Sequence, residues 1–292
     1  MGPAHPERPQ RLDVITDMLM TLRLLDFLAH HDAPRATRAQ LLRTHTPEYL
    51  DWLEAIVPES GYRDIDLDTR LTPKTLEAAL RAAGSAVLAT DLVLDGEVEN
   101  AFCPVRPPGH HATANRAMGF CFFNNVAVAA AHALEVRELE RVAIIDFDVH
   151  HGNGTDEIFE HDDRVLFCSL FQTGLFPLTD WSEPHRSGVY VPLEGGAGGE
   201  AMRQAVESTW RPALNAFEPE MVFVSAGFDA HVDDDISELA FSDADYQWLT
   251  EFVLDIAHRH ANGRLVSLLE GGYDLPSLAR CTGSHVKLLS GL

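Results

Sequence analysis

Cysteines are few in this chain of 292 residues, and long apolar runs are absent. The four cysteines stand far apart without a Cys-x-x-Cys spacing, which argues against a disulfide framework and against a zinc site built from thiolates. They are Cys103, Cys121, Cys168 and Cys281. No segment approaches the roughly 20 apolar residues of a membrane span, and the first residues lack the pattern of a secretory signal. These absences predict a cytoplasmic protein that does not act in a membrane.

Basic residues are scarce as well. The 22 lysines and arginines stand against 45 aspartates and glutamates, so the formal net charge is −23. A chain this acidic is repelled by nucleic acid, and no stretch of it forms a basic patch. Nucleic-acid binding is therefore excluded, whereas lysine-rich peptides or polyamines would be attracted. Solubility alone is also a sufficient reason for such a charge.

The apolar residues alternate between short continuous runs and segments with helical periodicity. Runs typical of buried strands lie at 101–105, 142–147, 165–170, 221–226 and 265–269. Helical patterns lie at 11–30, 47–56, 73–94, 126–136, 200–217, 243–260 and 275–289. Continuous apolar strands that alternate with helices predict a mostly parallel sheet with helices on both faces. No linker or internal repeat interrupts the pattern, so we predict one α/β domain over residues 1–292.

Local signals refine this pattern at four places. Residues 1–9 are rich in proline and predict an extended lead-in. The pairs Thr46-Pro47 and Thr72-Pro73 mark helix starts, because threonine caps a helix and proline suits its first position. The glycine-rich segment 195–199 lacks the lysine of a phosphate-binding loop, so we expect a flexible turn before a helix there.

Residues 144–154 concentrate carboxylates and imidazoles where a buried strand runs into a glycine-rich loop. Alternation in an extended chain puts Asp146, Asp148 and His150 on one side and His151 on the other. Mixed carboxylate and imidazole ligands suit a borderline metal such as zinc. A polar strand end without any metal would have the same composition.

Three more predicted strands end in residues of the same kind. His110 and His111 follow the strand at 101–105, Asp229 and His231 follow the strand at 221–226, and the segment 270–274 follows the last strand. Because the carboxyl ends of parallel strands meet at one edge of a sheet, we expect the four segments to converge.

The converging residue types allow roles to be assigned. A catalytic zinc needs three protein ligands and an open position for water, and Asp148, His150 and Asp229 can supply the ligands. His110 and His111 can act as general base and acid.

The neighbouring polar residues complete the predicted site. Asp146 and Asn153 are suited to fix imidazole tautomers, and Tyr273 can aim a hydroxyl at a developing oxyanion. Together these groups predict hydrolysis of an amide by metal-activated water. Covalent catalysis is disfavoured because no Gly-x-Ser-x-Gly motif is present.

The motifs that carry these residues resemble the zinc-dependent histone deacetylase superfamily, which includes bacterial deacetylase-like amidohydrolases and acetylpolyamine amidohydrolases. They follow the order of the family over nearly the whole chain, and the first and last look more like class II than class I. The motifs are HPERPQRL (5–12), RPPGHHA (106–112), GFCFFNN (119–125), DFDVHHGNGT (146–155), SAGFDAH (225–231) and LEGGYD (269–274). The resemblance implies a single arginase/deacetylase-like α/β domain around a parallel sheet of about eight strands.

The resemblance also implies a role for each matching residue. Zinc would bind Asp148, His150 and Asp229. His111 would be the general base and acid, and His110 would act electrostatically. Asp146 would orient His110, Asn153 would orient His111, and Tyr273 would polarise the scissile carbonyl.

For the substrate, the resemblance implies a narrow tunnel that accepts an acyl-lysine side chain. The Gly119 carbonyl would accept the substrate N–H, and Phe120 and Phe176 would form aromatic walls, although ordinary core packing is the alternative for both rings. Gly271 would also lie at the substrate. Ile236 stands where polyamine-selective relatives have a glutamate, which argues against polyamine selectivity.

Two further sites follow from the resemblance. A structural potassium ion would bind main-chain oxygens and the Ser169 hydroxyl; the main-chain oxygens are those of Asp146, Asp148, His150 and Leu170. Arg11 would line an internal pocket beneath the zinc.

Two departures from the family pattern stand out. Family members usually have a strand and a loop before HPERP, where this chain has four residues, so either the start is shortened or the chain is a truncation. Both alternatives concern the first edge strand and part of the pocket rim. Residues 233–237 (Asp-Asp-Asp-Ile-Ser) stand in place of the usual Asp-Pro-Leu-Gly stretch. The three adjacent aspartates could attract a cation, but we expect a solvated run of charge there.

The function that these observations favour is zinc-dependent removal of acetyl or other acyl groups from the ε-amino group of lysine or from similar linear amines. The alternatives are an acetylpolyamine deacetylase, an arginase-like dimanganese hydrolase and an acyl-lysine binding module without activity. A homo-oligomer is left open.

Overall fold

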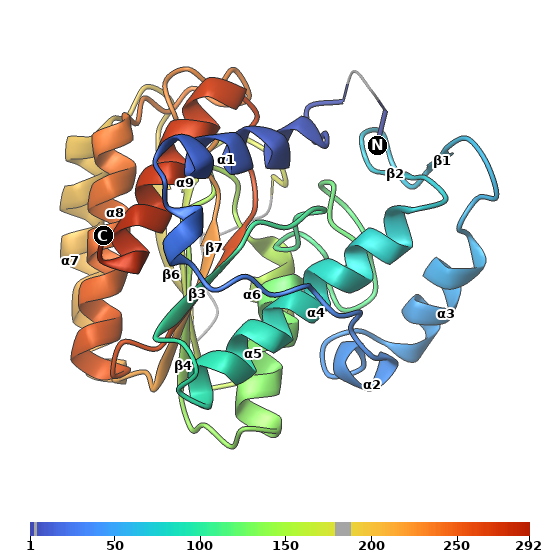
Figure 1. Ribbon diagram of the computed structural model, residues 1–292, viewed down its shortest axis with the longest axis horizontal. Helices are drawn as coiled ribbons and strands as arrows, with labels where there is room; N and C mark the ends of the chain where they lie inside the picture. Colours follow the sequence, from blue (N-terminus) through green and yellow to red (C-terminus); the bar gives the residue numbers. More distant parts are fainter. Residues whose placement is uncertain (3–4, 179–187) are drawn as a thin grey trace.

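A parallel sheet of six strands forms the centre of the computed structural model, which describes residues 1–2, 5–178 and 188–292 (Figure 1). The strand order is β3-β8-β7-β4-β5-β6, and every pair of neighbours is parallel. The strands are β3 (Asn100–Cys103), β4 (Val142–Asp146), β5 (Val165–Gln172), β6 (Gly188–Leu193), β7 (Met221–Ala226) and β8 (Leu265–Leu269). The predicted α/β class with a parallel sheet is confirmed.

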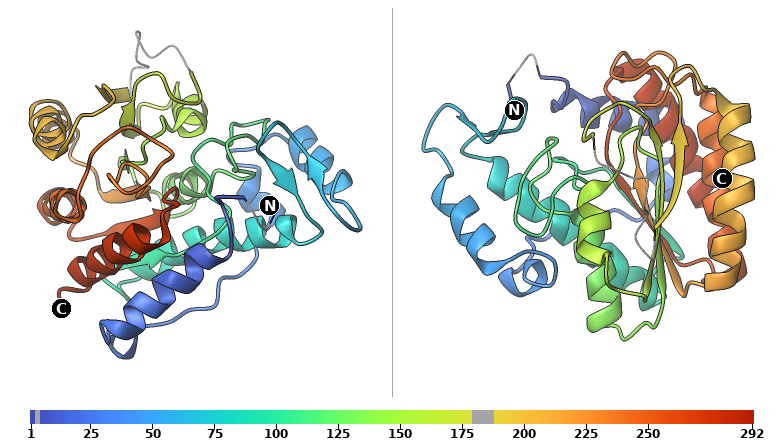
Figure 2. Two further views of the ribbon diagram at one scale, coloured as in Figure 1. Left: turned by 90° about the horizontal axis from the view of Figure 1, so that it is seen from above. Right: turned by 180° about the vertical axis from the view of Figure 1, so that it is seen from behind.

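Helices cover both faces of this sheet (Figure 2). One face packs against α1 (Gln10–Thr21), α7 (Gly199–Phe217), α8 (Asp243–His260) and α9 (Leu275–Ser290). The other packs against α4 (Thr75–Leu94), α5 (Asn125–Glu135) and α6 (Asn153–Phe159). Successive residues of β4 show the alternation: Ile144 belongs to the core cluster of the second face, and Ile145 belongs to that of the first. Burial on both faces is the reason that β4, β7 and β8 are continuous apolar runs.

A third, smaller core lies beyond α4. It joins α2 (Arg38–Leu41) and α3 (Pro47–Ala55), and a two-stranded hairpin of β1 (Arg63–Asp64) and β2 (Arg70–Leu71) lies next to it. The Thr46 hydroxyl accepts a hydrogen bond from the Tyr49 amide, so the predicted cap of α3 is confirmed. None of the helices in the described part of the chain is long and apolar enough to cross a lipid bilayer.

Several predicted boundaries were wrong. Helix α1 ends at Thr21, because Arg23 takes a left-handed φ of 57°, and a short 3-10 helix, η1 (Leu25–Phe27), follows. Helix α4 begins at Thr75, two residues after Pro73. The predicted glycine-rich loop is in part the first turn of α6, whose leading amides, on Gly154 and Thr155, donate to the His110 carbonyl. The predicted lead-in includes residues 3–4, which lie outside the described residues.

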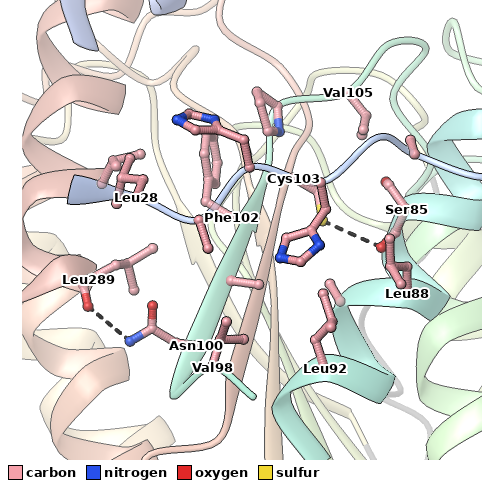
Figure 3. Close-up of a pocket in the computed structure, with 18 of the residues that line it drawn as sticks. Leu28, Ser85, Leu88, Leu92, Val98, Asn100, Phe102, Cys103, Val105 and Leu289 are labelled. Atoms are coloured by element: carbon pink, nitrogen blue, oxygen red, sulfur yellow. Dashed lines mark hydrogen bonds between the residues drawn. The ribbon is translucent and has the colours of Figure 1, made fainter. Parts of the chain in front are cut away.

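The predicted count of about eight strands was also wrong, because the described residues give the central sheet only six. On one side the sheet ends at β3, which flanks a groove of about 690 Å³ (Figure 3). Leu28, Leu92 and Leu289 line this groove together with Phe102, so it is largely apolar. The groove holds none of the acidic residues and histidines predicted for catalysis, and the candidate site lies elsewhere.

Candidate active site

The loops after β3, β4, β7 and β8 bring the predicted site residues together. These four strands are consecutive neighbours in the sheet and all run in one direction, so their carboxyl ends form one edge. Strand β4 ends at Asp146, and residues beyond it bend rather than extend. Asp148 and His150 nevertheless meet, while His151 lies apart and contacts Ser169 and Asp156.

Asp148, His150 and Asp229 form a compact group of ligand atoms. One atom from each residue lies within 4.8 Å of the others. His150 Nδ1 lies 2.9 Å from Asp148 Oδ1 and 3.4 Å from Asp229 Oδ2. The backbone holds both carboxylates in place, because Gly271 N donates to Asp148 Oδ2 at 2.8 Å and Val149 N donates to Asp229 Oδ1 at 3.0 Å.

This group fits a metal ion by its chemistry. Asp229 Oδ2 is buried and accepts no hydrogen bond in the described structure; its charged neighbour is His150 Nδ1 at 3.4 Å, in an orientation that makes no hydrogen bond. A buried carboxylate oxygen without a partner is costly, and a cation beside it removes that cost. Two carboxylate oxygens and one imidazole nitrogen are also a ligand set that zinc accepts. The three residues therefore fit the predicted metal site.

The same residues affect one another's charge. Burial opposes ionisation of Asp148, but the nearby imidazoles of His110 and His150 outweigh it and hold the pKa of Asp148 below its usual value. Burial and the neighbouring Asp148 raise the pKa of Asp229. A divalent cation is the direct means of keeping both carboxylates ionised in so small a volume.

The tandem histidines have different partners. His110 Nδ1 donates to Asp146 Oδ2 at 2.9 Å, and His111 Nδ1 donates to the Asn153 side-chain oxygen at 2.8 Å. The two ring centres are 4.0 Å apart, and His110 Nε2 lies 3.8 Å from Asp148 Oδ1. Both imidazoles therefore have Nδ1 engaged and keep Nε2 for chemistry at the metal group.

Their environments separate their protonation states. Burial would lower the pKa of His110, but the carboxylates of Asp146 and Asp148 outweigh it and raise the pKa to about 10. Burial lowers the pKa of His111 well below its usual value, and the charges of His110 and His150 add to that effect. These shifts favour the charged form of His110 and the neutral form of His111, which is the division that acid–base catalysis requires.

Glu270 is a further site residue, which has no predicted role. Its carboxylate accepts hydrogen bonds from the amides of Gly109 (2.6 Å) and His110 (3.2 Å) and from the Ser225 hydroxyl (3.1 Å). Burial raises the pKa of Glu270 to about 7, against the opposing charge of His110. Its place directly after β8 was the available signal. The contacts make Glu270 the support of the histidine loop.

Tyr273 is half-buried, and its ring contacts both a cation and a second aromatic ring. The Arg11 guanidinium lies 4.9 Å from its ring centre, and the Phe120 ring meets it edge-on at 5.9 Å. Arg11 is fully buried and donates through Nε to the Gly272 carbonyl at 2.7 Å, which fixes the turn before Tyr273. Burial raises the pKa of Tyr273 well above 10, so its hydroxyl stays protonated and can donate a hydrogen bond.

The two predicted aromatic walls flank the catalytic groups. Phe176 meets the His111 ring edge-on at 4.9 Å and is 38% exposed, and Phe120 contacts Tyr273 and His5. Neither ring belongs to one of the three core clusters, which argues against ordinary core packing. Gly119, directly before Phe120, has a φ of 56°, and a Cβ there would come within 2.4 Å of His111 Cδ2.

Two other predicted substrate positions differ in their surroundings. A Cβ at Gly271 would lie 2.0 Å from Asp229 Oδ2, so only glycine lets this backbone approach the carboxylates. Ile236 is half-buried and packs against the core of the first sheet face.

The predicted potassium ligands come from neighbouring strands. The register of β4 and β5 pairs Asp146 with Ser169, and Leu170 follows in β5. The Ser169 hydroxyl also lies 3.0 Å from His151 Nδ1.

A second group of potential ligands, His231, Asp243 and Cys281, does not fit a metal ion. His231 Nδ1 accepts from the Asp233 amide at 3.0 Å, so Nε2 carries the proton and donates to Asp243 at 2.8 Å. The Arg280 guanidinium already pairs with the Asp243 carboxylate at 2.8 Å. This group is a satisfied hydrogen-bond network that anchors the loop after β7.

Comparison with known proteins extends the geometric findings. A family model described as "Histone deacetylase domain" matches residues 5–289. The chain is 39% identical over 295 residues to "Histone deacetylase-like amidohydrolase" of Pseudomonas aeruginosa, which covers 99% of this chain and 77% of that protein. It is 38% identical over 282 residues to "Probable deacetylase" of Archaeoglobus fulgidus, covering 94% and 78%. The solved structure "Crystal Structure of HDA15 HD domain" matches with a TM-score of 0.92 at 34% identity, over 100% of this chain and 86% of that one.

Proposed function

Because the chain belongs to the histone deacetylase family, we propose that it is a zinc-dependent deacetylase. Its substrates carry an acetyl or other acyl group on the ε-amino group of a lysine side chain or on a similar linear amine, and the enzyme removes that acyl group. The observation that carries the proposal is the group of Asp148, His150 and Asp229, with a buried carboxylate oxygen that accepts no hydrogen bond, beside two histidines held through Nδ1 by Asp146 and Asn153.

The three ligands would hold one zinc ion, which supplies Lewis acidity toward the substrate carbonyl and lowers the pKa of a water molecule. The contacts of Gly271 and Val149 with the two carboxylates fix the ligand oxygens before a metal binds. Such preorganisation is what a catalytic metal site needs from its surroundings.

The remaining chemistry belongs to the side chains around the metal group. His111, neutral and held by Asn153, accepts the proton of the attacking water. His110, held as an imidazolium by Asp146, stabilises the negative charge that develops. Tyr273 donates its hydroxyl proton in a hydrogen bond to the developing oxyanion, and a histidine returns a proton to the leaving amine.

We assign substrate selection to the rings of Phe120 and Phe176 and to the turn at Gly119. Phe176 contacts His111 and Phe120 contacts Tyr273, so the two rings can enclose a linear methylene chain that leads to the catalytic groups. The Gly119 carbonyl can accept the amide N–H of the substrate. Two rings around one narrow chain suit acyl-lysine, and Ile236 offers no charge for a second ammonium, which disfavours a polyamine.

The potassium site is a further part of the proposal. Oxygen atoms are the ligands that hard cations prefer, and the register that pairs Asp146 of β4 with Ser169 of β5 supports such a site. Potassium there would be held by Ser169 Oγ and by the main-chain oxygens of Asp146, Asp148, His150 and Leu170. Such an ion would stiffen the segment from which both zinc ligands after β4 emerge.

The arginase-like alternative requires a second metal ion in the same site. Asp146 lies outside the group of Asp148, His150 and Asp229; its Oδ2 accepts from His110 at 2.9 Å and its Oδ1 accepts from the Asp148 amide at 3.1 Å. Both of its oxygens are therefore engaged in orienting other site residues. This contact pattern favours one metal ion.

The test compares substrates and variants in one assay. The protein, with its zinc quantified, is offered an acetyl-lysine peptide, acetylputrescine and acetylspermidine. We expect faster turnover of the peptide, and we expect His111→Ala and Tyr273→Phe each to lose most of that turnover while zinc still binds. Preference for the acetylated polyamines would support the polyamine alternative. Tight peptide binding without turnover would support the acyl-lysine binding module.

A further inference from the structure

The acidic run from Asp233 to Asp235 does not behave as one solvated patch. Asp234 is buried, with 3% of its surface exposed, whereas Asp233 and Asp235 are exposed. The predicted solvated run of charge was therefore wrong for its middle residue. A buried carboxylate in a site loop needs partners, and those partners show what it does.

The partners of Asp234 belong to a different loop. Asp234 Oδ2 accepts hydrogen bonds from the amides of Tyr273 at 2.6 Å and Asp274 at 3.0 Å. Asp234 Oδ1 accepts from the Ile236 amide at 3.3 Å, within its own loop. One carboxylate thus joins the loop after β7, which carries the ligand Asp229, to the loop after β8, which carries Tyr273.

No other acceptor in the described structure is bonded to either of these two amides. They stand where β8 turns into α9, and Asp274 caps that helix with its own side chain. Gly272, directly before them, has a φ of 113°, so the turn lacks the restraint that a side chain gives. Without the Asp234 carboxylate, both amides would lose their acceptor and the segment would be free to shift.

We propose that Asp234 is a positioning residue that sets the place of the Tyr273 hydroxyl relative to the oxyanion. The inference rests on the proposed function, in which Tyr273 donates to that oxyanion. Asp234 acts on the backbone of Tyr273, while Arg11 and Phe120 contact the ring. A small displacement of a preorganised donor costs much of its effect on the transition state and little of its effect on substrate binding.

Substitution of Asp234 by asparagine or by alanine separates the effect of its charge from the effect of its hydrogen bonds to the two amides. Asparagine can place its one carbonyl oxygen where Oδ2 stands and keep both amide contacts, and alanine keeps neither. Asp235→Ala is the matched control, because it removes an exposed aspartate from the same loop.

The first readout is amide hydrogen exchange, which does not depend on activity. We expect the amides of Tyr273 and Asp274 to exchange on the order of 10-fold faster in Asp234→Ala than in the control, and Asp234→Asn to restore most of the protection. Unchanged exchange in Asp234→Ala would overturn the proposal. If Asp234→Ala does not fold, the wild-type protein decides the question: both amides must then be protected from exchange, and rapid exchange of either would overturn the proposal equally.

The second readout is a double-mutant cycle on the zinc-loaded protein with an acetyl-lysine peptide. We expect Asp234→Ala to lower kcat on the order of 10-fold with KM and zinc content unchanged, and to have no further effect when Tyr273 is already phenylalanine. An equal loss in the Tyr273→Phe background, or a loss of zinc, would overturn the positioning role. A wild-type protein without any turnover would refute the proposed function, and hydrogen exchange would still decide the role of Asp234.

Discussion

Replacing Asp229 by asparagine is expected to stabilise the metal-free protein and to remove most of its stabilisation by zinc. In the folded chain, Asp229 Oδ1 accepts from the Val149 amide at 3.0 Å, and asparagine can keep that bond through its oxygen. Oδ2 has no hydrogen-bond partner in the described structure, and burial together with Asp148 raises the pKa of Asp229. The substitution therefore removes a charge that folding disfavours.

The magnitudes can be worked out for both states. A buried charged group without a hydrogen-bond partner costs more than a neutral amide in the same place, so the metal-free variant is expected to gain about 1–3 kcal/mol in free energy of unfolding. Zinc at 100 times its dissociation constant adds about 2.7 kcal/mol to the wild-type protein. The variant lacks one of three ligands and should gain much less at the same zinc concentration. Zinc should thus stabilise the wild-type protein by up to about 2.7 kcal/mol more than it stabilises the variant.

The assay is chemical denaturation followed by far-ultraviolet circular dichroism, with chelator and with zinc. Asp235→Asn makes the same change of charge at an exposed position and should leave both curves in place. If the variant loses about 3–5 kcal/mol in chelator, as a protein does when a buried ion pair is broken, then Asp229 and His150 form a structural ion pair. That result would refute the reasoning that the group is arranged for a metal ion.

Three further predictions concern pH, the histidine loop and the tunnel wall. Burial lowers the pKa of His285 to about 3, so below its ordinary value of 6.5 the unfolded chain binds a proton that the folded chain does not. The free energy of unfolding should therefore decrease as pH is lowered, by about 2 kcal/mol from pH 7 to pH 5 from this residue. Denaturation curves of His285→Gln should show a correspondingly smaller decrease. Glu270→Leu should lower the free energy of unfolding by about 3 kcal/mol or more, because two backbone amides lose their acceptor; Glu270→Gln should lose far less, and equal losses would contradict the assigned role. Phe176→Ala should raise KM for an acetyl-lysine peptide several-fold and leave thermal stability almost unchanged, since the ring is 38% exposed; steady-state kinetics and a melting curve would check both, and a fall in kcat alone would contradict a wall function.

The strands that the sequence predicted well are those buried on both faces. β4, β7 and β8 are continuous apolar runs because helices cover the sheet on either side, and their positions follow from composition alone. β6 escaped prediction because it is a half-buried edge strand that includes Pro192, so it has neither a continuous run nor a clean alternation. The total of about eight strands came from resemblance and not from any pattern, and the described residues do not supply it.

The candidate site likewise contains residues that could be predicted from the sequence and residues that could not. Side chains such as Asp148, His150 and Asp229 could be assigned because each follows a predictable strand and has metal-ligand chemistry. Glu270 and Asp234 were missed as functional residues because they act on backbone amides of loops that are distant in sequence. Such contacts depend on how two loops lie beside each other, and no local pattern of residues encodes that.

The most direct test of the central claim is acetate release from an acetyl-lysine peptide, measured while the metal-free protein is titrated with zinc. The account predicts that turnover rises in proportion to bound zinc and reaches its maximum at one ion per chain. It also predicts that Tyr273→Phe binds the same amount of zinc with most of the turnover gone. No acetate release at one zinc per chain, or maximal activity only with two manganese ions per chain, would contradict it.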